Sequence, residues 1–220
     1  MSAVSSAPPR VSVMIPVYNE EESLVTLHRE LDAALASVAG GAEIVFVDDG
    51  SKDRSLAVLR EIAEKDPRVR VVVLDGNHGQ TAAFAAGFDA VRGEITVTLD
   101  ADLQNDPADI PRLIAKLDAE GADVVNGVRQ KRRDSWVRLV SSRIANNARN
   151  WVTNESVTDV GCSLRAMRTE YVKRVRLFRN MHRFLPTLLR MEGATKVIEM
   201  PVAHRERRYG VSKYGIGNRL

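Results

Sequence analysis

Residues 97–107 read VTLDADLQNDP, a strand-forming run that ends in three aspartates, a glutamine and a proline. Side chains two residues apart on a strand point to the same face, so Asp100 and Asp102 are expected to aim together. Two neighbouring carboxylates repel each other unless a cation compensates them, and oxygen ligands completed by waters and substrate phosphates suit Mg2+ or Mn2+. The stretch therefore predicts a metal site made by Asp100, Asp102 and Gln104. Asp106 directly precedes the proline and instead favours a helix cap.

The strand before these aspartates is one of several in the first half of the chain. Apolar, β-branched runs alternate there with segments of helical periodicity. Strands are predicted over 11–18, 42–50, 69–76, 94–102 and 122–129, and helices over 19–38, 53–66 and 80–91 and from Pro107 onward. Near-continuous Val and Ile strands that alternate with helices are typical of a parallel sheet covered on both faces. The pattern predicts an α/β fold with a single mostly parallel sheet and a Rossmann-like nucleotide-binding half.

Polar clusters follow four of these strands, at residues 18–20, 48–51, 76–79 and 100–102. Because ligands of parallel α/β sheets bind beyond the carboxyl ends of the strands, we expect these clusters to form one site. One carboxylate of the second cluster, which contains Asp48 and Asp49, is a candidate to accept hydrogen bonds from a nucleoside. Asp-Asp-Gly-Ser is also a common turn sequence, so a purely structural role stays open.

The net charge of +3 divides sharply along the chain. Residues 1–128 carry 11 Lys and Arg against 22 Asp and Glu, whereas residues 129–220 carry 21 against 7. A basic half indicates an anionic partner, such as a phosphate, a nucleic acid or a membrane surface. Solvated faces that differ in charge by chance are the alternative. The single cysteine, Cys162, excludes an internal disulfide framework and is expected to be a small core residue.

The basic half begins with residues 129–152, in which arginines are interspersed with apolar side chains such as Trp136. Arg129 follows the fifth strand onto the predicted rim. Arg138 and Ser142 are four residues apart, so a helix places both on one face, where they can bind one phosphate. The mixture of charge and apolar bulk also suits a membrane interface. Further on, a strand is predicted over 161–168, a helix over 182–193 and a strand that enters a loop over 195–208.

A set of motifs spans both halves of the chain. They are VMIPVYNEEESL (13–24), VDDGSKDRS (47–55), NHGQTAAFAAGFDAVRGE (77–94), LDADLQNDP (99–107), GVR (127–129), DVGCSLRAMR (159–168) and GVSKYG (210–215). Together they resemble inverting family-two glycosyltransferases, which have the GT-A fold. More narrowly, they are similar to the branch of dolichyl-phosphate mannosyltransferases and bacterial polyprenyl-phosphate glycosyltransferases. The resemblance runs from Val11 to the end of the chain.

The resemblance implies roles for particular residues. The donor, a nucleotide sugar of the GDP-mannose or UDP-hexose type, is expected to be bound by Pro16, Tyr18, Glu20, Asp48, Asp49, Asp100, Arg205 and Lys213. The metal, Mg2+ or Mn2+, is expected on Asp100, Asp102 and Gln104. The acceptor phosphate is expected on Arg129, Arg138 and Ser142. The candidate catalytic residues are Asp102, Arg129 and Arg138.

The implied reaction is attack of a polyprenyl (dolichyl or undecaprenyl) phosphate oxygen on the anomeric carbon of the donor, with inversion. A phosphate monoester is already largely dianionic at pH 7, so no strong general base is required. The implied location is the cytoplasmic face of a membrane, by peripheral attachment or through anchoring segments. Many similar proteins continue beyond the SKYG motif into membrane helices. We therefore expect a flexible tail (1–10) and a single domain (11–220) of a longer protein, with a donor and metal half (11–128) and a basic acceptor half (129–220).

Two other functions fit parts of the sequence. A sugar hydroxyl acceptor, as in polysaccharide or O-antigen assembly, requires an aspartate base, and the dense arginines after Arg129 disfavour it. A non-catalytic module that binds nucleotide sugars or nucleic acid is the second alternative. Aromatic residues are only 5% and the acidic rim repels a nucleic-acid backbone, so no nucleic-acid partner is expected. His182 and His204 lack metal-ligand spacing and are interpreted as structural, while Asp159 is either structural or directed to the site.

Overall fold

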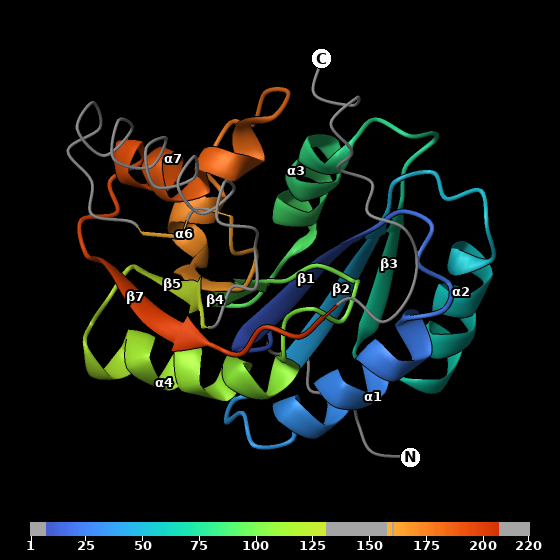
Figure 1. The fold of residues 1–220 in the computed structure, drawn as a ribbon, viewed down its shortest axis with the longest axis horizontal. Coiled ribbons are helices and arrows are strands. Elements are labelled where there is room, and N and C mark those ends of the chain that lie inside the picture. The colour runs from blue at the N-terminus through green and yellow to red at the C-terminus, as the bar shows by residue number, and fades with distance from the viewer. Residues whose placement is uncertain (1–7, 131–157, 160, 207–220) are drawn as a thin grey trace.

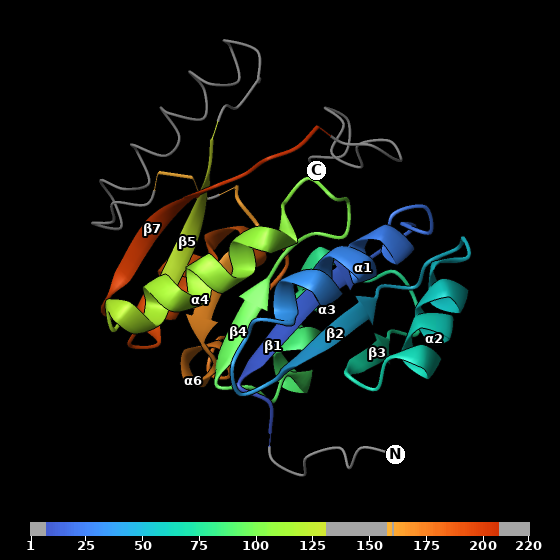
Figure 2. The ribbon, with the colours of Figure 1, turned by 90° about the horizontal axis from the view of Figure 1, so that it is seen from below.

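A computed structural model describes residues 8–130, 158–159 and 161–206. In this part of the chain the strands form a seven-stranded sheet of order β3-β2-β1-β4-β6-β5-β7 (Figures 1 and 2). They are β1 (Val11–Val17), β2 (Ala42–Asp48), β3 (Val69–Val73), β4 (Ile95–Thr98), β5 (Val124–Arg129), β6 (Arg165–Arg168) and β7 (Val197–Val202). Among these strands, β6 alone runs antiparallel to its neighbours, β4 and β5. The predicted single, mostly parallel sheet is confirmed.

Helices cover both faces of this sheet, as Figure 1 shows. One face carries α1 (Leu24–Leu35), α2 (Ser55–Lys65) and α4 (Ile110–Ala119), and the other carries α3 (Gln80–Ala90), α6 (Thr169–Val172) and α7 (Leu185–Met191). The 3-10 helices η1 (Pro107–Asp109) and η2 (Met181–Phe184) directly precede α4 and α7. None of the helices in the described residues combines the length and the apolar character that a bilayer crossing needs.

The β1 sequence VSVMIPV explains why there is a core on each face of the sheet. Successive side chains of a strand point to opposite faces. Val11, Val13, Ile15 and Val17 belong to the core that packs against α1, α2 and α4, whereas Met14 belongs to the core under α3 and α7. All five side chains are at most 1% exposed. A strand that is apolar on both faces needs helices on both, which places β1 in the interior of the sheet.

The strands end earlier than the sequence pattern predicts. Pairing between β1 and β4 ends at Met14 and Thr98, so Asp100 and Asp102 lie in a turn and not in the predicted strand 94–102. Leu103, in the same turn, has a φ of 62°, a left-handed conformation that a strand does not accommodate. The turn, and not strand alternation, therefore sets the directions of the two carboxylates.

Carboxylate side chains accept backbone hydrogen bonds at the start of two helices, and the one on Asp106 is the cap that the sequence predicts. Asp53 Oδ1 accepts a hydrogen bond from the Ser55 backbone N–H at 2.9 Å, immediately before α2. Asp106 Oδ1 accepts one from the Ala108 N–H at 3.0 Å, at the start of η1. Each cap satisfies a donor that has no partner within its helix. The caps therefore hold the loops after β2 and β4 at the carboxyl edge of the sheet.

The segment η2 packs against the start of α3 through His182. His182 Nδ1 lies 2.7 Å from Thr81 Oγ1, and the His182 ring stacks on Phe84 at a centroid distance of 5.7 Å. The Asn180 backbone N–H also donates to Thr81 Oγ1, at 3.0 Å. Burial, assisted by nearby arginines, lowers the pKa of His182 to about 4. These contacts agree with the structural role that the sequence indicates for His182.

Gly87 lies where α3 crosses β1, and a Cβ at this position would be 2.5 Å from Met14 Cγ and 3.1 Å from Val47 Cγ2. We expect Gly87→Ala to lower the free energy of unfolding by about 1–3 kcal/mol, because overpacking outweighs the gain of about 1 kcal/mol in helix propensity. Urea denaturation measures the change. In a double-mutant cycle, Gly87→Ala and Met14→Ala should cost less together than the sum of their separate costs. A Gly87→Ala protein as stable as the parent would contradict this packing.

His182 should make stability depend on pH. Its pKa of about 4 in the folded chain lies below the ordinary value of 6.5, so the unfolded chain takes up the proton first. The stabilisation is complete above pH 6.5 and is lost as the pH falls from about 6.5 towards about 4. His182→Gln keeps a partner for Thr81 without a titrating ring, and should reduce the fall in melting temperature between about pH 7 and pH 5. Equal falls for both proteins would rule out this assignment.

Candidate functional site

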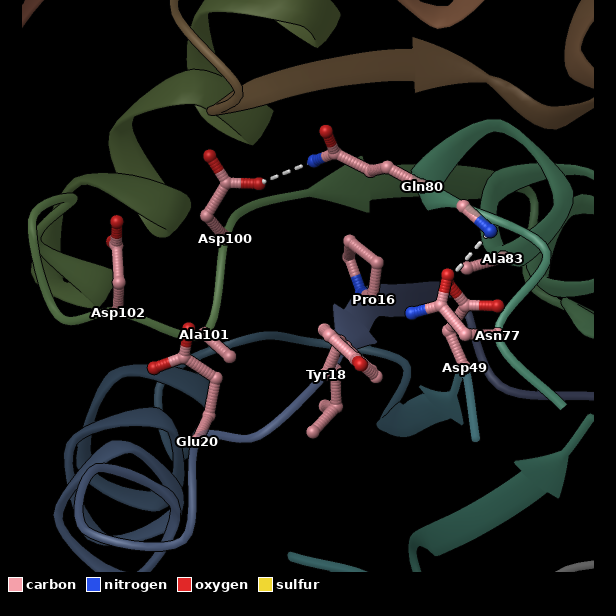
Figure 3. A pocket seen from close by; sticks show the side chains of 12 residues that line it. Pro16, Tyr18, Glu20, Asp49, Asn77, Gln80, Ala83, Asp100, Ala101 and Asp102 are labelled. Carbon is pink, nitrogen blue, oxygen red and sulfur yellow. Dashed lines mark hydrogen bonds between the residues drawn. The ribbon is translucent and has the colours of Figure 1, made fainter. Parts of the chain in front are cut away.

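The carboxyl ends of β1 and β4, the loops after β2 and β3 and the start of α3 enclose a cavity of about 230 Å³. Figure 3 shows Pro16 and Tyr18 in the middle of its lining, with Asp49 and Asn77 on one side. On the other side are Glu20 and the acidic turn, which is the turn after β4 that contains Asp100 and Asp102. A concave site with a few polar groups is the usual form of a small-molecule site. Six of the predicted site residues line this cavity: Pro16, Tyr18, Glu20, Asp49, Asp100 and Asp102.

The two adjacent aspartates after β2 have different surroundings. Asp49 lines the cavity and joins two loops, because its Oδ1 and Oδ2 accept the backbone N–H groups of His78 at 2.8 Å and Gly79 at 2.9 Å. Burial raises the pKa of Asp49 above its ordinary value, although these two donors act in the opposite direction. Asp48, one of the predicted donor-binding residues, is 1% exposed and does not line this cavity, and its Oδ2 accepts from the Ser51 N–H at 3.2 Å. This contact is the one that the turn interpretation expects.

Gln80, the first residue of α3, connects the helix to the acidic turn. Its Nε2 donates to Asp100 Oδ1 at 3.0 Å, and its side chain lines the cavity (Figure 3). Asn77, which also lines the cavity, belongs to the polar cluster 76–79 that the sequence places at the site, although no role is predicted for it. Gln80 is missing from the predicted site residues, and the available signal is its position directly after this cluster.

A smaller cavity of about 30 Å³ lies on the other side of the acidic turn. Asp100 and Asp102 line both cavities, and the smaller one is completed by Gln104, Asn105, Arg129, Gly161, Ser163 and His204. Asp102 is 8% exposed, and its Oδ1 accepts from the Gln104 N–H at 3.1 Å. An antiparallel bridge between Asn105 and His204 brings the end of β7 to this turn. Sequence spacing does not reveal that contact, so His204 was interpreted as structural.

The donor set around the smaller cavity fits Mg2+ or Mn2+. Asp100 and Asp102 offer carboxylate oxygens and Gln104 an amide oxygen, which are hard ligands that these ions prefer. Among the described residues, no group of three or more His, Cys, Asp and Glu side chains is placed to hold a metal by itself. In phosphate sites Mg2+ is usually bound by one or two carboxylates together with substrate phosphates. The arrangement therefore suits an ion that binds jointly with a diphosphate.

Arg129 enters the smaller cavity from the end of β5 and is held there by Asp159. Its Nε and one terminal nitrogen donate to the two carboxylate oxygens of Asp159, both at 2.8 Å. The side chains of Arg129 and Asp159 are 17% and 5% exposed. Asp159 thus fixes the direction of the guanidinium. Nearby, burial raises the pKa of the Cys162 thiol to about 11, which suits the inert core residue that the sequence indicates.

Arg205 lies against the outer side of the acidic turn. Its backbone N–H donates to the Gln104 carbonyl at 2.7 Å, and its guanidinium forms ion pairs of 2.7 Å with Glu30 and with Asp106. The Arg205 side chain, which is predicted to face substrate phosphates, is therefore paired with two carboxylates of the protein in this structure. The remaining predicted site residues, Arg138, Ser142 and Lys213, lie outside the described residues.

Comparisons with known proteins identify relatives of the whole described domain. The family model for glycosyl transferase family 2 matches residues 12–176. The undecaprenyl-phosphate 4-deoxy-4-formamido-L-arabinose transferase of Edwardsiella ictaluri is 46% identical over 207 residues, which are 94% of this chain and 63% of the relative. The enzyme of the same name from Klebsiella pneumoniae is 45% identical over 206 residues, 93% of this chain and 62% of the relative. The chain thus spans less than two thirds of the length of these curated relatives.

Solved structures share the fold. Glucosyl-3-phosphoglycerate synthase from Mycobacterium tuberculosis, in complex with Mg2+ and uridine diphosphate, has a TM-score of 0.70 at 22% identity and covers 92% of this chain and 73% of its own. The mannosyltransferase PcManGT from Pyrobaculum calidifontis, in complex with GDP-mannose and Mn2+, has a TM-score of 0.64 at 22% identity and covers 92% and 58%. Both are glycosyltransferases of the GT-A fold, so the fold expected from the sequence motifs is confirmed. Since the family model covers most of its length, the chain belongs to glycosyl transferase family 2.

Proposed function

We propose that this chain transfers a sugar from a nucleotide sugar to a polyprenyl phosphate, with inversion at the anomeric carbon. The observation that carries the proposal is the position of Asp100 and Asp102, which line the larger cavity and the smaller one at once. The larger cavity is lined by five of the eight predicted donor-binding residues, and the smaller one is lined by Arg129. The curated relatives are named as transferases that act on undecaprenyl phosphate, and this supports the same class of acceptor for this chain.

The donor occupies the larger cavity in this proposal. Pro16 and Tyr18 offer apolar surface to the nucleoside, and Asp49 holds the loop that contains Asn77 against it. The diphosphate then lies over the acidic turn. Two carboxylates repel a diphosphate, so a cation is required between them. Asp100, Asp102 and Gln104 are the residues that would hold a Mg2+ or Mn2+ ion, and such an ion would supply positive charge that stabilises the leaving nucleoside diphosphate.

The acceptor phosphate approaches from the side of Arg129. A planar guanidinium binds phosphate through two parallel hydrogen bonds, and Asp159 keeps it pre-oriented. Because the phosphate is already dianionic near pH 7, positioning replaces general-base catalysis. Asp102 orients the acceptor and does not remove a proton from it. Since the acceptor is a membrane lipid, the proposed location is the cytoplasmic face of a membrane.

The acidic turn should be essential for transfer and dispensable for folding. We expect Asp102→Asn to lower kcat/KM by about 100-fold or more in the presence of Mn2+, because one of two charged ligands is lost. Transfer of radiolabelled sugar to undecaprenyl phosphate from a donor panel measures it, beginning with the formamido-arabinose nucleotide. Asp118→Asn is the matched control, since Asp118 pairs with Arg10 and Arg168 away from the cavities. Full activity of Asp102→Asn, or transfer to a sugar hydroxyl alone, would contradict the proposal.

Substitution of Arg129 and Asp159 should weaken acceptor binding and leave donor binding nearly unchanged. The double substitution Arg129→Gln/Asp159→Asn removes both charges without leaving either one buried and unpaired. We expect the KM for polyprenyl phosphate to rise by about ten-fold or more, because a charge-assisted hydrogen bond is lost. The Kd of the nucleoside diphosphate, measured by calorimetry, should stay within about two-fold of the parent. An equal loss of nucleotide affinity would place Arg129 on the donor instead.

A further inference from the structure

The segment that follows α6 and includes α7, residues 173–191, carries basic residues and no acidic ones. Residues 173–191 contain six Lys and Arg and no Asp or Glu. Five of the six basic side chains are exposed: Lys173, Arg174, Arg176, Arg179 and Arg183. Some of this charge is used locally, because Lys173 donates to the Asp89 carbonyl and Arg174 pairs with Glu170. The segment nevertheless presents a strongly cationic surface to solvent.

The same segment also exposes large apolar side chains. The described residues include five large hydrophobic side chains that are exposed, and three of them lie in this short stretch. Phe178 is 70% exposed, Phe184 is 46% exposed and Met191 is 77% exposed. The buried side chains of α7, among them Leu185 and Leu189, already fill the core below, so packing within the chain does not account for the exposed ones. Three large exposed apolar side chains within one short stretch are the feature that suggests an interaction surface here.

This surface borders the larger cavity. The Asn180 N–H and the His182 ring both contact Thr81, as described above, and Thr81 directly follows Gln80 in α3. Gln80 lines the cavity and donates to Asp100. Figure 1 shows α6, α7 and α3 on one face of the sheet. An object that docks on residues 173–191 therefore lies next to the cavity mouth.

We propose that residues 173–191 form a surface that docks on the anionic phospholipid headgroups of a bilayer. Arginines attract anionic headgroups, while phenylalanine and methionine side chains enter the boundary between headgroups and acyl chains. Residues 173–191 contribute no carboxylate of their own, and Glu170, which precedes them, is paired with Arg174, so positive charge prevails on this surface. The proposal rests on the proposed function only for its purpose, which is to bring the cavity mouth to the level of a lipid-borne phosphate.

Vesicle sedimentation with the 220-residue chain tests the docking directly. The parent chain should bind vesicles that contain phosphatidylglycerol more tightly than vesicles of phosphatidylcholine alone, and less tightly at high salt. Each arginine near an anionic surface contributes about five-fold to the partition coefficient, so Arg176→Gln/Arg179→Gln/Arg183→Gln should lose roughly 100-fold. Phe178→Ser/Phe184→Ser should lose about ten-fold for each ring that enters the bilayer boundary.

Matched controls use exposed side chains elsewhere in the fold. Arg29→Gln/Arg60→Gln/Lys65→Gln removes the same charge from α1 and α2, and Val25→Ser/Val73→Ser removes the other two exposed hydrophobics. Both controls should keep vesicle binding within about two-fold of the parent, since neither set lies in the docking segment. Docking is refuted if the segment variants bind as the parent does, if the controls lose as much, or if the segment variants lose binding to duplex DNA but not to vesicles.

Activity measurements separate this inference from the proposed function. With a short-chain, water-soluble prenyl phosphate, the segment variants should transfer sugar at the rate of the parent. With polyprenyl phosphate in vesicles they should be slower, in proportion to their loss of binding. A parent chain that binds anionic vesicles but transfers sugar to neither acceptor would reject the proposed function and leave the docking surface standing.

Discussion

The organisation of the site depends on one electrostatic constraint, the placement of two carboxylates, Asp100 and Asp102, directly after β4. Both side chains line the same small cavity, and like charges that share a site favour the binding of a cation. Each accepts a neutral hydrogen bond, Asp100 from Gln80 and Asp102 from the Gln104 N–H. These neutral donors help to fix the directions of the two carboxylates. Under the proposed function, a divalent cation would bind at these carboxylates together with a diphosphate.

Positive charge close to this turn is already engaged by carboxylates. Arg129 pairs with Asp159, and Arg205 pairs with Glu30 and Asp106. The buried Arg165, which is 3% exposed, donates to Asn126 at 2.6 Å and has Asp100 and Asp159 among its charged neighbours. The acidic and basic halves of the sequence thus meet at this edge of the sheet. Under the proposed function, substrate phosphates would have to compete with these carboxylates for the arginines.

Much of this arrangement follows from local sequence patterns. The strands and helices up to β5, the caps at Asp53 and Asp106 and the gathering of polar clusters at one sheet edge all depend on periodicity and on residues close in sequence. The features that the patterns missed depend on contacts between distant segments. β6 shows no sequence sign of its antiparallel direction, because strand composition carries no information on orientation. Its insertion between β4 and β5 is decided by how the chain returns to the sheet.

The same distinction applies to individual site residues. The acidic pair is visible in the sequence because its members are two residues apart, although the turn places them differently from a strand. Gln80 and His204 reach the turn through the tertiary arrangement of α3 and β7, so their spacing gave no indication of it. The ion pair of Arg129 with Asp159 joins residues 30 positions apart and likewise needs the folded sheet. Sequence therefore identifies the chemical groups of the site, and the fold determines their partners.

Titration of Mn2+, followed by electron paramagnetic resonance, tests most directly whether the acidic turn binds a cation jointly with a diphosphate. The chain alone should bind Mn2+ weakly. When uridine or guanosine diphosphate is added, the chain and nucleotide together should lower the signal of free Mn2+ by roughly ten-fold more than the nucleotide alone does. Asp100→Asn/Asp102→Asn should abolish the difference. An unchanged Mn2+ affinity in the doubly substituted chain with nucleotide would show that the ion does not bind at this turn.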